Sequence, residues 1–248
     1  MSSKTMNIVN AASPKRVAVV VANPSVSKTT GWPIGFWWSE LTHPFYEFSQ
    51  AGYNVQVFSP KGGKVEGDGL SDPRDPSGYS AHDLISMGFV NTPELMALLE
   101  KTKRVSEIRP EDFDAVMIAG GQSPMYTMVD NPDLDKLLKM FYESGKVTAA
   151  LCHGVASLLS AKLSNGDPLI KGKTITGFAN VEEDYADAYV GKKLQPFRIE
   201  DEAKKIGANF VQGGMFKEFA VRDGNLITGQ QNYSGAITAR TIIQALGL

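Results

Sequence analysis

The sequence contains a single cysteine, Cys152, only three histidines, and no apolar run of membrane-spanning length. One cysteine excludes an intramolecular disulfide, and three histidines without ligand-like spacing argue against a metal site. The absence of a long apolar run argues against a transmembrane helix. The 25 basic and 27 acidic residues nearly cancel, which leaves a net charge of -2. This balance argues against nucleic acid or an anionic membrane as partner and favours a small molecule.

The first 15 residues also lack a continuous apolar stretch, so they do not resemble a signal peptide. We expect residues 1–15 to form a flexible tail. Residues 16–248 should form one α/β domain, because no linker-like segment divides them. A free thiol and the lack of a leader segment favour a cytoplasmic location.

Four segments rich in valine and other apolar residues predict strands covered on both faces, as in a parallel sheet. They are residues 16–22, 53–59, 115–119 and 147–151. Helical patterns occupy 40–50, 92–102, 131–144 and 234–245, and short strand patterns occupy 173–176, 209–211, 218–221 and 225–228. This alternation predicts a doubly wound, mostly parallel sheet with helices on both faces. Residues 61–87 are rich in Gly, Pro, Asp and Ser, which predicts an irregular insertion.

Cys152 lies between the last long strand pattern and a helical pattern. Ala150 and Gly154 stand two positions away on either side, and small residues are required there if a tight strand-to-helix turn presents a nucleophile. The N-terminus of the following helix would favour the thiolate. The ring of His153 is not expected to turn onto the adjacent sulfur, but its N–H can bind an oxyanion. The alternatives are a buried structural cysteine and a turn histidine.

Two further strand ends carry residues suited to chemistry, and reactive groups collect at the carboxyl ends of strands in open α/β sheets. Gly120 and Gly121 follow the third strand, where glycines let a ligand approach backbone N–H groups. Glu40 follows an aromatic segment at 32–38. A carboxyl beside the sulfur, in a pocket walled by Trp37, Trp38 and Phe178, would resist ionisation and could exchange protons with a substrate. The alternative for Glu40 is a solvated residue in the first helical turn.

These motifs resemble the ThiJ/PfpI superfamily, whose fold is like that of flavodoxin and class I glutamine amidotransferases. The resemblance rests on AALCHG at 149–154, AVMIAGGQ at 115–122 and ELTHPFYEFSQAGYNVQVFSP at 40–60. PLIKGKTITGF at 168–178 and DGNLITGQQNYSG at 223–235 extend it over nearly all of residues 16–248. Within the superfamily, the chain is most similar to the branch associated with glutathione-independent glyoxalase activity and holdase chaperoning.

The resemblance implies a catalytic group of Cys152, His153, Glu40 and Glu183. Cys152 would be the nucleophile, and Glu183 would support its histidine neighbour, with Glu182 and Asp184 as alternatives for that role. The expected oxyanion and substrate-binding residues are Gly120, Gly121, Gln122, Gly154 and Trp38. Glyoxalase-like relatives often carry histidine where this chain has Gln122, which leaves the substrate open.

The implied function is a lyase of the D-lactate dehydratase type that converts methylglyoxal to lactate through the thiol. It would need neither a metal nor an organic cofactor. One alternative is a stress-related holdase chaperone. Another is the same thiol used for isonitrile hydration or for amide or peptide hydrolysis. Members of the superfamily commonly dimerise, so a homodimer is expected.

Overall fold

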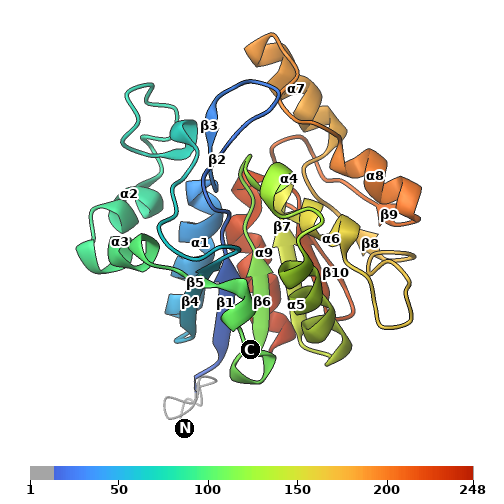
Figure 1. Ribbon diagram of the computed structural model, residues 1–248. Coiled ribbons are helices and arrows are strands. Elements are labelled where there is room, and N and C mark those ends of the chain that lie inside the picture. Colours follow the sequence, from blue (N-terminus) through green and yellow to red (C-terminus); the bar gives the residue numbers. More distant parts are fainter. Residues whose placement is uncertain (1–13, 248) are drawn as a thin grey trace, which may run out of the picture.

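A seven-stranded sheet forms the centre of the computed structural model, which describes residues 14–247. The first 13 residues of the predicted tail lie outside this range. The strands are β1 (Arg16–Val20), β4 (Asn54–Ser59), β5 (Lys103–Arg104), β6 (Ala115–Ile118), β7 (Val147–Leu151), β10 (Ala220–Asp223) and β11 (Leu226–Gly229). Their order is β10-β11-β7-β6-β1-β4-β5 (Figure 1). Every pairing is parallel except that of β10 with β11, which confirms the predicted mostly parallel sheet.

The helices cover both faces of this sheet (Figure 1). They are α1 (Trp38–Gln50), α2 (Leu84–Val90), α3 (Pro93–Glu100), α4 (Pro124–Thr127), α5 (Pro132–Glu143), α6 (Ser157–Ser160), α7 (Asn180–Val190), α8 (Ile199–Ile206) and α9 (Gly235–Ala245). Two short pairs, β2 (Ser25–Val26) with β3 (Pro33–Ile34) and β8 (Thr174–Ile175) with β9 (Asn209–Phe210), complete the described elements. No helix among residues 14–247 combines the length and apolar character that crossing a bilayer requires.

Alternate residues of β1 enter two separate cores, as the period of a strand requires. Val17 and Val19 pack with α1, α2, α3 and α9 on one face, while Ala18 and Val20 pack with α5, α6 and α8 on the other. All four side chains are fully buried. The valine-rich sequence of β1 therefore reflects burial on both faces, and its carboxyl end is left as the edge where a site can open.

The sequence patterns did not predict α7 and α8 and placed α2 partly inside the irregular insertion. α2 and α8 contain only seven and eight residues, too few for a helical period to stand out. α7 carries acidic and tyrosine side chains around most of its circumference, so it shows little apolar stripe. Within residues 61–87, the chain forms a short 3₁₀ turn at Gly69–Ser71 and ends in the first residues of α2.

Candidate active site

The chain turns sharply at Cys152, directly after β7. Cys152 has a φ of 56°, in the left-handed region that residues with a side chain rarely adopt. The expected helix begins here as a 3₁₀ turn, Cys152–Ala156, which continues into α6. A Cβ on Gly154 would lie 2.7 Å from the carbonyl oxygen of Ile118 and 2.8 Å from that of Ala119. Gly154 therefore lets the turn pack against the end of β6, and it is not among the residues lining the pocket described below.

His153 lies between the sulfur and a buried carboxylate. Its Nδ1 atom is 3.7 Å from Cys152 Sγ, and its Nε2 atom is 2.9 Å from Glu183 Oε1. The ring stacks on Phe178 at a centroid distance of 4.3 Å. The expectation that this ring could not reach the adjacent sulfur is wrong, because the left-handed backbone at Cys152 brings the two side chains to the same side.

Three consecutive acidic residues at the start of α7 have different partners. Glu183 bonds His153 and is almost fully buried. Glu182 is also buried, but it accepts hydrogen bonds from the backbone of Ala179 and Phe216 and from the Gln230 side chain. Asp184 is exposed and pairs with Arg198. Of the three candidates, only Glu183 bonds the histidine, because its turn of α7 faces the elbow.

The Glu40 side chain, in the first turn of α1, reaches the Cys152 thiol. It is fully buried, and its Oε2 atom accepts a hydrogen bond of 2.8 Å from the N–H of Gly120. Within residues 14–247, no nitrogen or oxygen donor bonds its other oxygen, Oε1. Burial raises the pKa of Glu40 to about 8, opposed in part by the Cys152 thiol and the Gly120 N–H. The expectation of a carboxyl that resists ionisation therefore agrees with its surroundings.

The thiol itself is not favoured as a thiolate in the way the sequence suggested. Burial, followed by the nearby negative charge of Glu40, raises the pKa of Cys152. The backbone N–H groups of His153 and Gly121 oppose this shift, so both face the sulfur. The helix after the elbow is too short and too distorted to dominate. A negative charge on Glu40 therefore opposes ionisation of the thiol.

Gly120 and Gly121, directly after β6, have no side chains and so leave room for the groups packed around them. A Cβ on Gly120 would lie 2.6 Å from Glu40 Oε2, 2.8 Å from the His153 nitrogen and 2.9 Å from the Cys152 Cβ. Gly121 has a φ of 106°, and a Cβ at this position would collide with the backbone before α1. A side chain at position 120 would displace Glu40, His153 and Cys152, and one at position 121 would displace the backbone of residues 35–37, so both positions require glycine.

Asp68, within the irregular insertion, supports the glycine turn and carries no signal in the sequence patterns. Its two carboxyl oxygens accept hydrogen bonds from the N–H groups of Gly35, at 2.9 Å, and Gln122, at 2.7 Å. Its own N–H donates to the carbonyl oxygen of Phe36. Asp68 is buried, and burial raises its pKa to about 7. The insertion is thus anchored to the site by a buried carboxyl.

A pocket opens directly over Cys152, at the carboxyl edge of the sheet and beneath α7. Gln122, His153, Phe178 and Glu183 line it together with the sulfur. Trp38 does not line it: its ring is 3 % exposed and packs edge-on against Phe36 and Phe89 in the core. Trp37, the residue before α1, faces the pocket instead. The helix starts at position 38, so adjacent tryptophans point in different directions.

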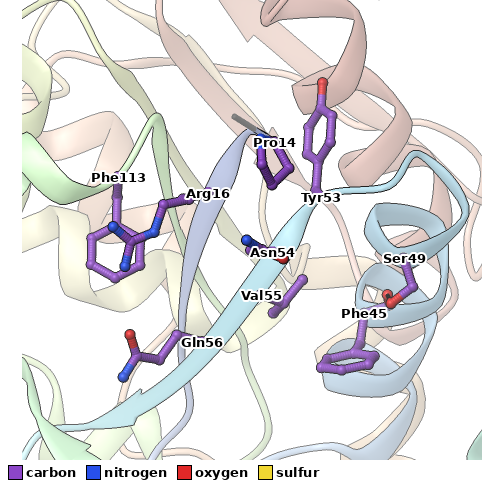
Figure 2. Close-up of a pocket in the computed structure, with 9 residues that line it drawn as sticks. All are labelled: Pro14, Arg16, Phe45, Ser49, Tyr53, Asn54, Val55, Gln56 and Phe113. Atoms are coloured by element: carbon purple, nitrogen blue, oxygen red, sulfur yellow. Dashed lines mark hydrogen bonds between the residues drawn. The ribbon is translucent and has the colours of Figure 1, made fainter. Parts of the chain in front are cut away.

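A second, larger cavity of about 760 Å³ lies at the opposite end of the sheet, near the start of β1 and β4 (Figure 2). Its lining contains no cysteine, histidine or carboxylate side chain among the described residues. Its one charged side chain, Arg16, lies over the ring of Phe113 at 4.9 Å. The larger cavity therefore offers no thiol, imidazole or carboxylate for catalysis, whereas the pocket over Cys152 offers all three. No cluster of His, Cys, Asp or Glu suited to a metal ion occurs within residues 14–247.

Known proteins of one family are similar to this chain over most of its length. The model of the DJ-1/PfpI family matches residues 35–245. Glyoxalase 3 of Candida albicans is 32% identical over 92% of this chain and 98% of its own length. A glutathione-independent glyoxalase of Saccharomyces cerevisiae is 30% identical over 94% of this chain and 98% of its own. The crystal structure of glyoxalase III from Candida albicans superposes with a TM-score of 0.79 at 30% identity, covering 93% of this chain and 97% of that one.

Proposed function

The chain belongs to the DJ-1/PfpI family, and we propose that it is a glutathione-independent glyoxalase whose nucleophile is Cys152. One observation carries the proposal. The sulfur lies 3.7 Å from His153 Nδ1, against the buried Glu40 carboxyl, and faces the N–H groups of His153 and Gly121. This arrangement supplies a nucleophile, a proton carrier on either side and an oxyanion site at one point.

The reaction begins when the thiol of Cys152 gives its proton to His153 and the sulfur adds to the aldehyde carbon of a 2-oxoaldehyde. The aldehyde oxygen becomes an oxyanion, which the N–H groups of Gly121 and His153 stabilise. The oxyanion then takes the proton back from His153, which leaves a hemithioacetal. Glu183 holds the imidazole through Nε2, so that Nδ1 stays directed at the sulfur.

Glu40 then moves a proton between adjacent carbons. Its carboxylate removes the hydrogen from the carbon that carries sulfur, which forms an enediolate, and returns it to the neighbouring carbon, while the hydroxyl proton of the first carbon passes to the oxygen of the second. The product of this step is a thioester of a 2-hydroxy acid. Water hydrolyses the thioester, releasing the acid and restoring the thiol. The net reaction adds one water to the 2-oxoaldehyde, and it consumes no oxidant or reductant.

The proposal is tested by Cys152→Ala, assayed with methylglyoxal in the absence of glutathione. Lactate formation should fall to the uncatalysed rate, because no other cysteine exists to replace the nucleophile. Turnover by the variant at the wild-type rate would overturn the mechanism. The same variant distinguishes the glyoxalase from the holdase alternative. A holdase should still suppress aggregation of client proteins after the sulfur is removed.

A homodimer in the cytoplasm completes the proposal. It is supported by the sequence resemblance. Sedimentation equilibrium measures the assembly: a mass of twice 26.9 kDa is expected, and a monomer at micromolar concentration would contradict it. A parallel screen with isonitriles and peptide amides tests hydration and hydrolysis by the same thiol.

A further inference from the structure

The pocket over Cys152 is far more apolar than methylglyoxal requires. It encloses about 190 Å³, and most of its wall is aromatic or aliphatic. The side chains that form this wall are Trp32, Trp37, Leu70, Tyr79, Phe178, Tyr185, Tyr189, Val190, Leu194 and Phe216. An apolar cavity of about 150 Å³ accommodates a benzene molecule. The pocket therefore has room for a phenyl-sized group next to the sulfur.

The aromatic rings form a continuous path from the reacting groups to the pocket mouth. His153 stacks on Phe178, whose ring centroid is 6.4 Å from that of Phe216. Phe216 in turn meets Tyr185 edge-on at 5.4 Å. Tyr185 is 52% exposed, so the path ends in solvent. A flat ring on a substrate would find edge and face partners along this whole path.

Phe216 is held in this path at a cost. Its φ is 51°, one of three left-handed values among the described residues with side chains, and another belongs to Cys152. Its N–H donates a 3.0 Å hydrogen bond to the buried carboxylate of Glu182, which Gln230 also bonds at 2.8 Å. Strained backbone persists where the surroundings fix it, and it concentrates at binding sites. The buried carboxylate is the anchor that fixes this ring.

The charges of the pocket lining indicate which charge a substrate can carry. None of the described lining residues is lysine or arginine. Lys192 lies over the ring of the lining residue Trp32 at 4.5 Å, but it does not itself line the pocket. The one carboxylate in the lining, Glu183, is paired with His153. An anionic substituent would lose its hydration without gaining a counter-charge.

From these observations we propose that the preferred substrates are uncharged 2-oxoaldehydes with an aromatic substituent, and that Phe216 determines this preference. The inference rests on the glyoxalase function proposed above and specifies its substrate class. The aldehyde carbon would meet Cys152 while the ring packs against Phe216 and Tyr185. With phenylglyoxal, the same addition, proton transfer and hydrolysis would add one water and yield mandelate.

The test compares initial rates for methylglyoxal, phenylglyoxal and 4-carboxyphenylglyoxal. The wild-type kcat/KM for phenylglyoxal should exceed that for methylglyoxal by about tenfold or more, because the ring gains apolar and aromatic contacts. The carboxylated analogue should lose most of this gain. Phe216→Ala should lower the phenylglyoxal value about tenfold and the methylglyoxal value by a clearly smaller factor. Tyr46→Ala is the control, because that ring is 46% exposed on α1 and lies outside the pocket lining.

The outcomes separate the two proposals. If methylglyoxal is converted and phenylglyoxal is not preferred, the substrate class is wrong and the glyoxalase function stands. Equal losses for both substrates in Phe216→Ala would also overturn the specificity role, because a purely structural residue acts on both. If the wild type converts neither substrate, the glyoxalase function fails. Binding of acetophenone to Cys152→Ala then tests the aromatic site alone: binding that Phe216→Ala weakens supports the site, and no binding overturns it.

Discussion

The inner and outer walls of the pocket differ in how deeply their residues are buried and in the role that we propose for them. We define the inner wall as Cys152 and His153, which line the pocket, together with Glu40, Gly120 and Gly121, which are buried next to them but do not line it. These residues lie at the ends of strands or in the first turn of α1. The outer wall consists of Trp32, Tyr79, Tyr185, Tyr189 and Phe216, most of them more than a third exposed. Reaction chemistry requires fixed distances and exclusion of water, whereas recognition tolerates movement. In the proposed function, the inner wall carries out the reaction and the outer wall selects the substrate.

The inner wall costs stability because it buries ionisable groups. Burial raises the pKa of Glu40 to about 8. It raises that of Asp68, behind the glycine turn, to about 7. Ionising either group inside the protein is therefore unfavourable at the pH where the proposed chemistry needs a carboxylate. The outer wall contributes aromatic contacts that solvent already reaches.

Glu40→Gln gives the largest expected effect on the inner wall. The amide keeps the shape of the side chain but cannot accept and return a proton, so kcat should fall by roughly 10²- to 10⁴-fold. The wild-type rate should rise with pH through about 8, where the raised pKa of Glu40 lies. Steady-state kinetics between pH 6 and 9 measure both effects. Retention of more than half of the activity would remove Glu40 from the chemistry.

The same substitution should alter how stability depends on pH. Between pH 4.5 and about 8, the folded wild type retains a proton on Glu40 that the unfolded chain has lost. Its unfolding free energy should therefore fall as pH rises through this window, by on the order of a few kcal/mol. Glu40→Gln should reduce this slope and leave the contribution of Asp68, whose pKa burial raises to about 7. Urea unfolding at pH 5 and pH 8.5 provides the measurement, and parallel curves for both proteins would contradict it.

Gly120→Ala should damage the inner wall without removing any reacting group. Its methyl group would overlap Glu40, His153 and Cys152, so activity should drop about 100-fold and stability by about 1–3 kcal/mol. Gly88→Ala is the matched control, because nothing lies within 4 Å of the added methyl group in α2. That control should be active and slightly more stable. Normal kinetics of Gly120→Ala would show that the inner wall is less rigid than its packing implies.

Glu183→Gln should have a smaller effect, of roughly tenfold or more on kcat, since the histidine remains but loses its charged partner. Asp184→Asn is the neighbouring control, because that carboxylate is exposed and pairs with Arg198. The pH dependence of kcat should shift only in the first variant. If kcat and its pH dependence were the same in the two variants, the 2.9 Å hydrogen bond between Glu183 and His153 would not contribute to catalysis.

Tyr189→Ala tests the outer wall and should have the smallest effect. This side chain is 74% exposed, so the folded state loses little when it is removed, and stability should change by no more than about 0.5 kcal/mol. The KM for an aromatic substrate should rise a few-fold at constant kcat. A fall in kcat comparable to that of Glu183→Gln would break the division between the two walls.

The two walls also differ in how far the sequence could predict them. Strands such as β7 and the turn at Cys152 show continuous apolar runs followed by small residues, which is a local signal. Glu40 was placed by its position in a first helical turn and by the family resemblance. These signals arise from burial, which constrains residue type at every position.

The remaining residues depend on contacts between distant segments. Asp68 bonds Gly35 and Gln122, which are 33 and 54 positions away. The start of α1 at Trp38 decides that Trp37 and not Trp38 faces the pocket. A helix that began one residue earlier or later would change which of the two tryptophans faces it. Phe216 depends on Glu182, 34 positions earlier. No periodicity reports such pairs, because each is fixed only after the sheet has brought its segments together.

Covalent trapping on the sulfur tests the central claim most directly. Cys152 is the only cysteine, so an acid-quenched turnover mixture can be analysed by intact mass and by peptide mapping without competing thiols. We predict an adduct with the mass of one 2-oxoaldehyde on the peptide that contains Cys152, and none in Cys152→Ser. Steady turnover with no adduct on this peptide at any quench time, and an unmodified thiol throughout, would contradict the account.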